Sequence, residues 1–385
     1  MRHFAFVSND DRDRLFLRAP EEFGLDDDPE LLGAALGATL YCPATRTNLA
    51  EDITRRARDG MVSVVVCLED AVADEQLRSA ETNAIAQLRE LDAGAPDLPM
   101  IFIRVRAASQ IPMILDGLGS ASSVLAGFVV PKFTEDTGGA FLEQIVSAGE
   151  RLGRPIHVMP VLEAGEMIFA ESRVDALLGA RRLLEKYRDI VPAVRVGATD
   201  LSSAYGLRRP RELTVWNVRV VADALTDFVN VMGRADGGFV MTGPAWEYYS
   251  ATERLFKPQL RETPFVAHDE RRLRAQLIAA ELDGLIREVM LDRANGLMGK
   301  TVIHPSHIAA VHALSVVAHE EYTDACDVLA TRAHGGAVAS SYGNKMNESK
   351  PHTAWARRTV LRARAFGVAR EGVSFVDLLG ACLHQ

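Results

Sequence analysis

The sequence predicts a (β/α)₈ TIM barrel with a C-terminal helical extension. Eight short apolar runs rich in β-branched residues recur along the chain, and most are followed by a segment with helical spacing. The runs are continuously apolar, which is typical of strands buried on both faces of a parallel sheet. Eight such units indicate a closed barrel. An open doubly wound sheet is the alternative, but no Gly-x-Gly-x-x-Gly follows a strand, which disfavours its dinucleotide-binding form.

The expected strands and helices alternate over most of the chain. Between the first two strands, Leu49, Ile53 and Ala57 recur every four residues, and a similar helical spacing runs through 270–296. A long loop is expected over 244–269, which contains three prolines and several aromatic residues. The eight expected strands are 38–42, 61–67, 100–105, 126–130, 156–161, 194–197, 237–242 and 301–304.

Three regions follow from this pattern: an acidic N-terminal leader over 1–35, the barrel over 36–333, and a C-terminal arm over 334–385. The arm starts at two glycines, continues through a polar stretch, and takes on helical spacing at 353–366. A segment of this kind can act as a lid or a subunit contact.

Composition excludes several classes of protein. The 385 residues carry a net charge of −9 with a pI near 5.6, which argues against nucleic acid as a partner. The four cysteines form no Cys-x-x-Cys pair, and Cys42 and Cys67 lie in apolar runs where buried thiols are expected. The N-terminus lacks a signal-peptide core, and no apolar stretch reaches the roughly 18 residues of a membrane-spanning helix. We therefore expect a cytoplasmic protein that does not bind membranes.

Two carboxylates suggest a metal site. Glu163 and Asp200 each follow a β-branched run, at the point where a strand should end. Carboxyl ends of parallel strands meet at one face of a barrel, so these side chains should lie close together. Mg²⁺ prefers oxygen ligands and keeps several waters that a substrate can displace. The sequence therefore predicts Mg²⁺ on Glu163 and Asp200.

Further charged residues occur at other strand ends. Glu69 and Asp70 follow the second strand, Arg104 and Arg106 lie at the end of the third, and Lys132 follows the fourth. Each has a structural interpretation as a helix cap or an ion-pair member. Together they suggest a site, because charged residues are rarely buried without a partner. Arg104 can clamp a carboxylate or stabilise an enolate, while the acidic pair can position a water.

These motifs resemble the citrate lyase β-subunit and malyl-CoA lyase group of the HpcH/HpaI aldolase superfamily. The resemblance implies a (β/α)₈ barrel, Mg²⁺ on Glu163 and Asp200, Arg104 as the residue for the substrate carboxylate and enolate, and a pocket lined by Glu69 and Asp70. It also implies a homo-oligomer, a trimer or hexamer, whose C-terminal segment caps a neighbour's site. The matching segments are 68–72, 103–106, 127–132, 162–164, 197–201 and 299–306.

Departures from the family pattern concern the substrate. Arg106 stands where the family usually has Asn, and the loop from Cys42 to Arg46 lacks the usual Gly, so recognition of a thioester stays open. Arg46, Arg106 and Lys132 are candidate substrate-binding residues beside Arg104. Glu348 stands where the family has a lid Asp and is a candidate catalytic residue.

We therefore expect a Mg²⁺-dependent carbon–carbon lyase of aldol or Claisen type. Its substrate would be a 2-oxo or 2-hydroxy acid, either a small carboxylic acid or an acyl thioester. Two alternatives stay open. One is a phosphoryl-transfer or hydrolase barrel acting on a phosphoenolpyruvate-like substrate, which the paired cations Arg104 and Arg106 would suit. The other is a non-catalytic protein that binds a metal and an acid.

Overall fold

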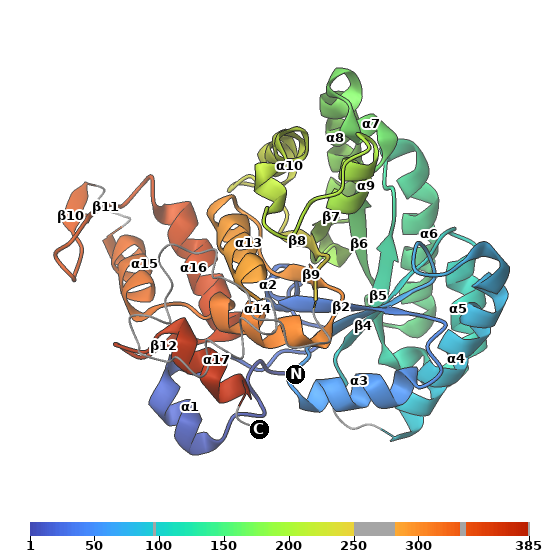
Figure 1. Ribbon diagram of the computed structural model, residues 1–385, viewed down its shortest axis with the longest axis horizontal. Coiled ribbons are helices and arrows are strands. Elements are labelled where there is room, and N and C mark those ends of the chain that lie inside the picture. Colours follow the sequence, from blue (N-terminus) through green and yellow to red (C-terminus); the bar gives the residue numbers. More distant parts are fainter. Residues whose placement is uncertain (95–97, 250–281, 332–335, 384–385) are drawn as a thin grey trace.

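The computed structural model describes residues 1–94, 98–249, 282–331 and 336–383, and it confirms the predicted barrel. Eight parallel strands close on themselves, each paired with its neighbours in chain order (Figure 1). Because all eight run the same way, their carboxyl ends gather at one rim. The strands are β2 (Ala38–Pro43), β3 (Ser63–Cys67), β4 (Met100–Arg104), β5 (Leu125–Val130), β6 (His157–Leu162), β7 (Val194–Val196), β8 (Met241–Trp246) and β9 (Lys300–Val302).

Helices cover the outside of the barrel (Figure 1). They bury one face against strands whose residues are almost all buried, as the continuous apolar runs require. One of the longer helices shows clear end signals: α6 starts at a capping box made by Thr134 and Thr137 and stops at left-handed Gly153. The main barrel helices are α3 (Leu49–Arg58), α4 (Leu77–Gly94), α5 (Gln110–Leu118), α6 (Glu135–Leu152), α7 (Gly165–Ile168), α8 (Ala170–Glu185), α9 (Ala198–Ser203), α10 (Arg219–Met232), α13 (Asp283–Ala294) and α14 (Ile308–Ser315).

Seven of the expected strands agree with the structure within two residues, and β8 is the exception. The predicted strand 237–242 was wrong in position, since β8 covers Met241–Trp246. The expected loop starts at Pro244, yet Gly243 and Pro244 lie within the strand, where the pairing with β9 is irregular. Proline is tolerated at such irregularities because no regular ladder bond is lost there. The rest of the expected 244–269 loop from residue 250 onward, and the helical pattern before residue 282, lie outside the described residues.

The N-terminal leader packs closely on the rest of the molecule. It contains α1 (Asn9–Leu15), β1 (Phe16–Arg18) and α2 (Pro29–Ala35). His3 is fully buried, its Nε2–H donates a hydrogen bond to Ala35 O over 2.8 Å, and its ring centre lies 4.5 Å from that of His312 of α14. Burial lowers the pKa of His3 to about 4, so its imidazole is neutral at physiological pH.

The C-terminal region contains α15 (His319–Thr331), β10 (Ala337–Ala339), β11 (Met346–Glu348), α16 (Thr353–Phe366), β12 (Val368–Ala369) and α17 (Phe375–Leu383). The helix expected at 353–366 is therefore present as α16. β12 pairs with β1 of the leader, α16 packs on α15 and α2, and α17 packs on α14. The β10–β11 hairpin projects away from the barrel at the far left of Figure 1. None of the described helices has the length and apolar character that crossing a membrane requires.

Candidate active site

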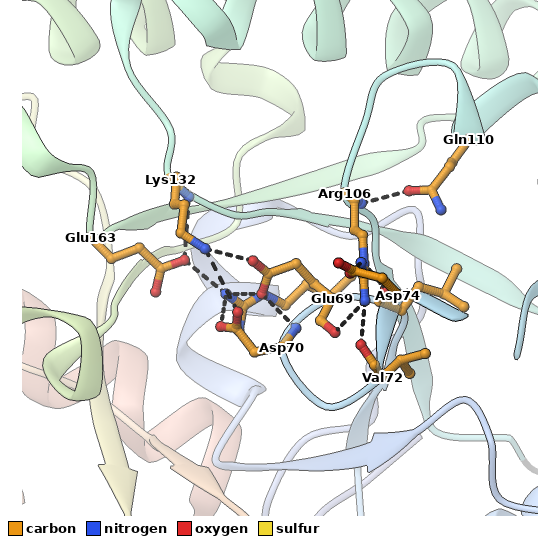
Figure 2. A network of polar contacts seen from close by, with 10 residues as sticks. Glu69, Asp70, Val72, Asp74, Arg106, Gln110, Lys132 and Glu163 are labelled. Carbon is orange, nitrogen blue, oxygen red and sulfur yellow. Dashed lines mark hydrogen bonds and ion pairs between the residues drawn. The ribbon is translucent and has the colours of Figure 1, made fainter. Parts of the chain in front are cut away.

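The charged residues predicted at the strand ends do gather at the carboxyl rim of the barrel. We call them the rim cluster: Glu69, Asp70, Arg104, Lys132, Glu163 and Asp200. Figure 2 shows Glu69, Lys132 and Glu163 turned toward one another, with dashed lines joining them through a shared network. The six residues come from the ends of five strands, β3 to β7, so formation of the barrel brings them together.

Arg104, the last residue of β4, is the centre of this cluster. Its Nη2 lies 2.7 Å from Glu69 Oε2, 2.8 Å from Glu163 Oε1 and 3.2 Å from Asp70 Oδ2. The residue is 9% exposed, and its Nε has no hydrogen-bond partner among the described residues. Burial alone would lower the pKa of Arg104, but Glu163 and its other anionic neighbours raise it overall, so the guanidinium stays charged.

Glu163 follows β6 and is almost completely buried, with 3% exposed. Its Oε1 accepts hydrogen bonds from Arg104 and, over 3.2 Å, from the backbone N–H of Lys132. Its Oε2 faces Gly197, where a Cβ would lie only 1.9 Å away, so glycine is needed there for space. Burial raises the pKa of Glu163 to about 7; Arg104 opposes this rise, and the carboxylates of Asp200 and Glu69 add to it.

Lys132 links the rim cluster to solvent. Its Nζ lies 2.7 Å from Glu69 Oε1 and 3.7 Å from Asp70 Oδ1, and half of its side chain is exposed. Its backbone is left-handed, with φ of 48°, which is uncommon for a residue other than glycine and occurs most often where function requires it. This conformation points the backbone N–H at Glu163 while the side chain reaches Glu69.

Charge in the rim cluster does not balance. Four carboxylates face two cations, so the cluster has an excess of two negative charges when all four carboxylates are ionised, and the raised pKa values of Glu163 and Asp70 reflect this excess. Two of these carboxylates, Glu163 and Asp200, are close enough for each charge to act on the other, and Glu163 Oε2 receives no hydrogen bond from a described residue. Hard oxygen donors with uncompensated charge fit Mg²⁺. No group of three or more His, Cys, Asp or Glu side chains placed for a metal occurs in the described ranges. Glu163 and Asp200 would therefore hold the ion with help from water or substrate.

A pocket of about 390 Å³ opens beside the rim cluster. Glu69, Asp70 and Lys132 form its polar side, and Phe141 of α6 lies on its apolar side. The volume is at the lower end of the range for small-molecule sites and suits a small acid or the end of a larger ligand.

Arg106 has a structural role that the sequence did not predict. Its Nε donates to Leu68 O over 2.7 Å, its Nη2 donates to the carbonyls of Glu69 and Val72, and its Nη1 pairs with Asp74 (Figure 2). These bonds hold the loop that carries Glu69 and Asp70. Arg106 also borders the pocket, so its substrate-binding role stays a prediction while its structural role is evident.

Two other candidates lie away from the rim cluster. Arg46, in the loop after β2, pairs with Asp52 of α3 and is largely exposed. Glu348 is an exposed residue of β11, and its backbone N–H donates to His352 Nδ1 over 3.1 Å. Because the hairpin projects away from the barrel, Glu348 does not reach the rim of its own protomer (Figure 1).

Sequence reasoning missed two residues inside the barrel. Arg195, the middle residue of β7, is 1% exposed; its guanidinium contacts the hydroxyls of Thr39 and Thr301 and lies 5.4 Å from the ring centre of Tyr41. Burial raises the pKa of Tyr41, whereas Arg195 and Arg104 oppose the rise. Tyr41 thus lies between a buried cation and the rim cluster. The only signal was an arginine within an otherwise apolar strand.

Comparisons with known proteins identify similar sequences and folds. The family described as C–C bond lyase of the TIM-barrel fold matches residues 30–368. A citrate lyase subunit beta-like protein of Deinococcus radiodurans is 30% identical over 181 residues, which is 46% of this chain and 56% of that protein. The match thus spans little more than half of the relative's length.

Two solved structures share the fold. A citrate lyase from Burkholderia xenovorans is 17% identical with a TM-score of 0.57, over 89% of this chain and 96% of that one. The protein CitE from Mycobacterium tuberculosis, in complex with magnesium, acetoacetate and coenzyme A, is 21% identical with a TM-score of 0.50, over 86% of this chain and 99% of that one.

Proposed function

Because this chain belongs to the carbon–carbon bond lyases of the TIM-barrel fold, we propose that it cleaves or forms a carbon–carbon bond next to the carbonyl of a 2-oxo or 2-hydroxy acid, with Mg²⁺ as cofactor. The resemblance to the citrate lyase β-subunit group is thereby confirmed at the level of the family. The exact substrate and the requirement for magnesium are part of the proposal.

One observation carries this proposal: the rim cluster holds two more carboxylates than cations. Glu163 and Glu69 are buried, and negative charge in such a position is costly unless a cation balances it. A divalent ion on Glu163 and Asp200 would restore neutrality. When bound, Mg²⁺ supplies a Lewis acid that polarises the C2 oxygen of the acid.

The chain's own residues have separate tasks in this proposal. Arg104 is held from three sides by carboxylates, so its permanent charge has a fixed position from which to stabilise a substrate carboxylate or a developing enolate. Lys132 is half exposed beside the pocket and can bind an anionic group of the substrate. Arg106 maintains the position of Glu69 and Asp70 through the loop that it clamps.

The contacts of Arg106 also favour a lyase reaction over a phosphoryl-transfer reaction. A phosphoryl-transfer reaction would favour Arg104 and Arg106 as paired phosphate ligands. Three backbone carbonyls and Asp74 already surround the Arg106 guanidinium, which leaves it poorly placed to bind a phosphate. The lyase is therefore the better supported function. An acyl thioester is one substrate class within it, in line with the coenzyme A bound to the M. tuberculosis protein.

Magnesium titration followed by calorimetry tests the cofactor. Wild-type protein should give a binding isotherm of modest affinity, because only two protein carboxylates hold the ion. Asp200→Ala should abolish it, while Asp175→Asn, which alters an exposed carboxylate of α8, should leave it unchanged. An Asp200→Ala protein that binds Mg²⁺ like the wild type would remove the basis of the proposal.

We further propose that the protein is a homo-oligomer, a trimer or hexamer, in which Glu348 serves the rim of a neighbouring copy. The hairpin that carries Glu348 is remote from its own rim, so another copy is the only barrel within its reach. Deleting the arm is a poor test, because α16 and α17 pack into the core and their loss would unfold the protein.

Complementation between two inactive variants avoids that difficulty. Asp200→Ala and Glu348→Gln should each lower turnover strongly on their own. Co-expression should restore part of the activity, because some sites then combine an intact Asp200 with a neighbour's intact Glu348. If mixed oligomers stay as inactive as the separate variants, Glu348 does not act across the subunit boundary.

A further inference from the structure

A second cavity lies at the opposite end of the barrel from the rim cluster. It has a volume of about 720 Å³ and is bordered by Leu297, Met298 and Gly299, which directly precede β9. The rim cluster lies at the carboxyl ends of the strands, so this crevice lies at their amino ends. Its other wall is the C-terminal helix α16, which lies beside α13 in Figure 1.

Three arginines line this crevice: Arg293 of α13, and Arg358 and Arg362 of α16. Arg293 donates to Leu314 O over 3.0 Å, and Arg358 donates to Gly233 O, so both use backbone carbonyls instead of acids. Arg362 alone has an acidic partner, Glu321.

The arginines of the crevice are short of negative charge. The Arg362 side chain is 9% exposed, and its Nε has no hydrogen-bond partner among the described residues. Asp292 also borders the crevice, but its carboxylate lies 2.6 Å from Lys300 Nζ and is committed to that ion pair. Burial lowers the pKa of Arg293, the nearby charge of Arg362 lowers it further, and the carboxylate of Glu321, which also borders the crevice, only partly opposes this.

The rest of the crevice is apolar. Trp355 of α16 and Met290 of α13 border it and are 38% and 50% exposed, so both offer apolar surface to a ligand. Val289 and Leu297 continue the apolar lining. The volume falls within the range of ligand sites, and concave apolar walls with a few convergent polar groups are characteristic of such sites.

We propose that this crevice binds a small phosphorylated ligand with an aromatic portion, the chemical class of the nucleoside phosphates. The phosphate would supply the charge that the arginines lack, since guanidinium groups bind phosphate oxygens in pairs. Trp355 and Met290 would pack on the aromatic portion. The concentration of arginines stands out in a chain whose net charge is −9. The site is separate from the rim cluster and does not depend on the proposed lyase function.

Calorimetric titration of the full-length protein with ADP tests this proposal. ADP should bind to the wild type, and Arg293→Met and Arg358→Met should each weaken binding about tenfold or more, the loss expected for a charge-assisted bond. Within the described ranges neither residue forms an ion pair with an acid, so neither substitution breaks an ion pair there. Absence of ADP binding to the wild type, or unchanged affinity in both variants, would overturn the proposal.

Two control variants test whether ADP binds in this crevice or elsewhere. Arg364→Met alters the same helix outside this crevice, where the side chain pairs with Glu21, and should bind ADP like the wild type. Arg46→Met alters the rim end of the barrel and should also bind ADP normally. If Arg46→Met weakens binding and Arg293→Met does not, ADP occupies the rim end, and the crevice is not its site.

Pyrophosphate and adenosine, the two parts of ADP, test the arginine contacts and the aromatic contacts separately. Pyrophosphate should bind more weakly than ADP but keep its sensitivity to Arg293→Met. Adenosine should bind weakly and show little sensitivity to that substitution. Pyrophosphate that binds as tightly as ADP would contradict the role given to Trp355 and the aromatic portion.

Discussion

Two groups of charged residues in the barrel, the partly buried rim cluster and a buried group between β9 and α13, differ in charge balance. The rim cluster has four carboxylates and two cations. The second group, which we call the β9 cluster, has two of each together with an indole N–H. Lys300 of β9 and Glu288 are both 0% exposed. Its members are Arg209, Trp216, Glu288, Asp292 and Lys300.

Every charge of the β9 cluster has a partner. Lys300 Nζ lies 2.7 Å from Glu288 and 2.6 Å from Asp292. Arg209 pairs with the other oxygen of Glu288, and Trp216 Nε1 donates to Asp292 over 2.8 Å. Such a cluster is complete without any ligand. The contrast indicates that a cluster of ionic residues is a candidate ligand-binding site when its charges are unbalanced, and not merely when it is buried.

The largest expected effect is on stability, from breaking the β9 cluster. Lys300→Met removes the cation that two buried carboxylates share, so the free energy of unfolding should fall by about 3–5 kcal/mol. Chemical denaturation measures this loss. Lys186→Met, at an exposed position at the end of α8, should change stability by no more than about 0.5 kcal/mol. A loss below about 1 kcal/mol in Lys300→Met would mean that the cluster is not structural.

A substitution of Arg104, at the centre of the rim cluster, should affect activity, by a smaller free energy than Lys300→Met affects stability. Arg104→Lys keeps the charge but loses the planar guanidinium, so turnover of the true substrate should fall more than about tenfold, the equivalent of about 1.5 kcal/mol. Binding of a small dicarboxylate such as oxaloacetate, measured by calorimetry, should weaken in parallel. Full activity in Arg104→Lys would assign Arg104 a purely structural role.

The smallest expected effect is on the stability of the metal-free protein after Glu163→Gln. This change removes one unit of the excess negative charge while Arg104 keeps Glu69 and Asp70 as partners. Stability without Mg²⁺ should therefore change by no more than about 1 kcal/mol, in contrast with Lys300→Met. Thermal unfolding with and without Mg²⁺ should show that the variant has lost stabilisation by the ion. A large loss of metal-free stability would place Glu163 with the structural charges.

The fold could be predicted almost completely from the pattern of apolar runs. The runs that begin β2 to β7 and β9 are long and strongly β-branched, and their positions agree with the structure. β8 was misplaced because Gly243 and Pro244 normally interrupt a strand, and nothing local reveals the irregular pairing that accommodates them. Gly243 has a further reason to be glycine, since a Cβ there would lie 2.5 Å from Asp292 Oδ2 in the β9 cluster.

The residues of the rim cluster could be predicted from the sequence, but their contacts could not. Acidic and basic residues at successive strand ends had to meet once the barrel was recognised. The partners of Arg106 were not predictable, because its guanidinium bonds to carbonyls of a loop more than 30 positions earlier in the chain. Arg195 was also missed, since an isolated arginine in a strand gives no indication of whether it faces the interior or the helices.

The sequence by itself therefore determined the barrel, the family resemblance, and the set of carboxylates and cations at its rim. Local patterns suffice for these features, because consecutive residues show which strands are buried and where each strand ends. Only the tertiary structure decided which charges are balanced, that Arg106 clamps a loop, and that Glu348 lies far from its own rim. These features depend on distances between residues that are remote in sequence. Which charges meet in one place, and how many of each sign, is decided only when the barrel forms.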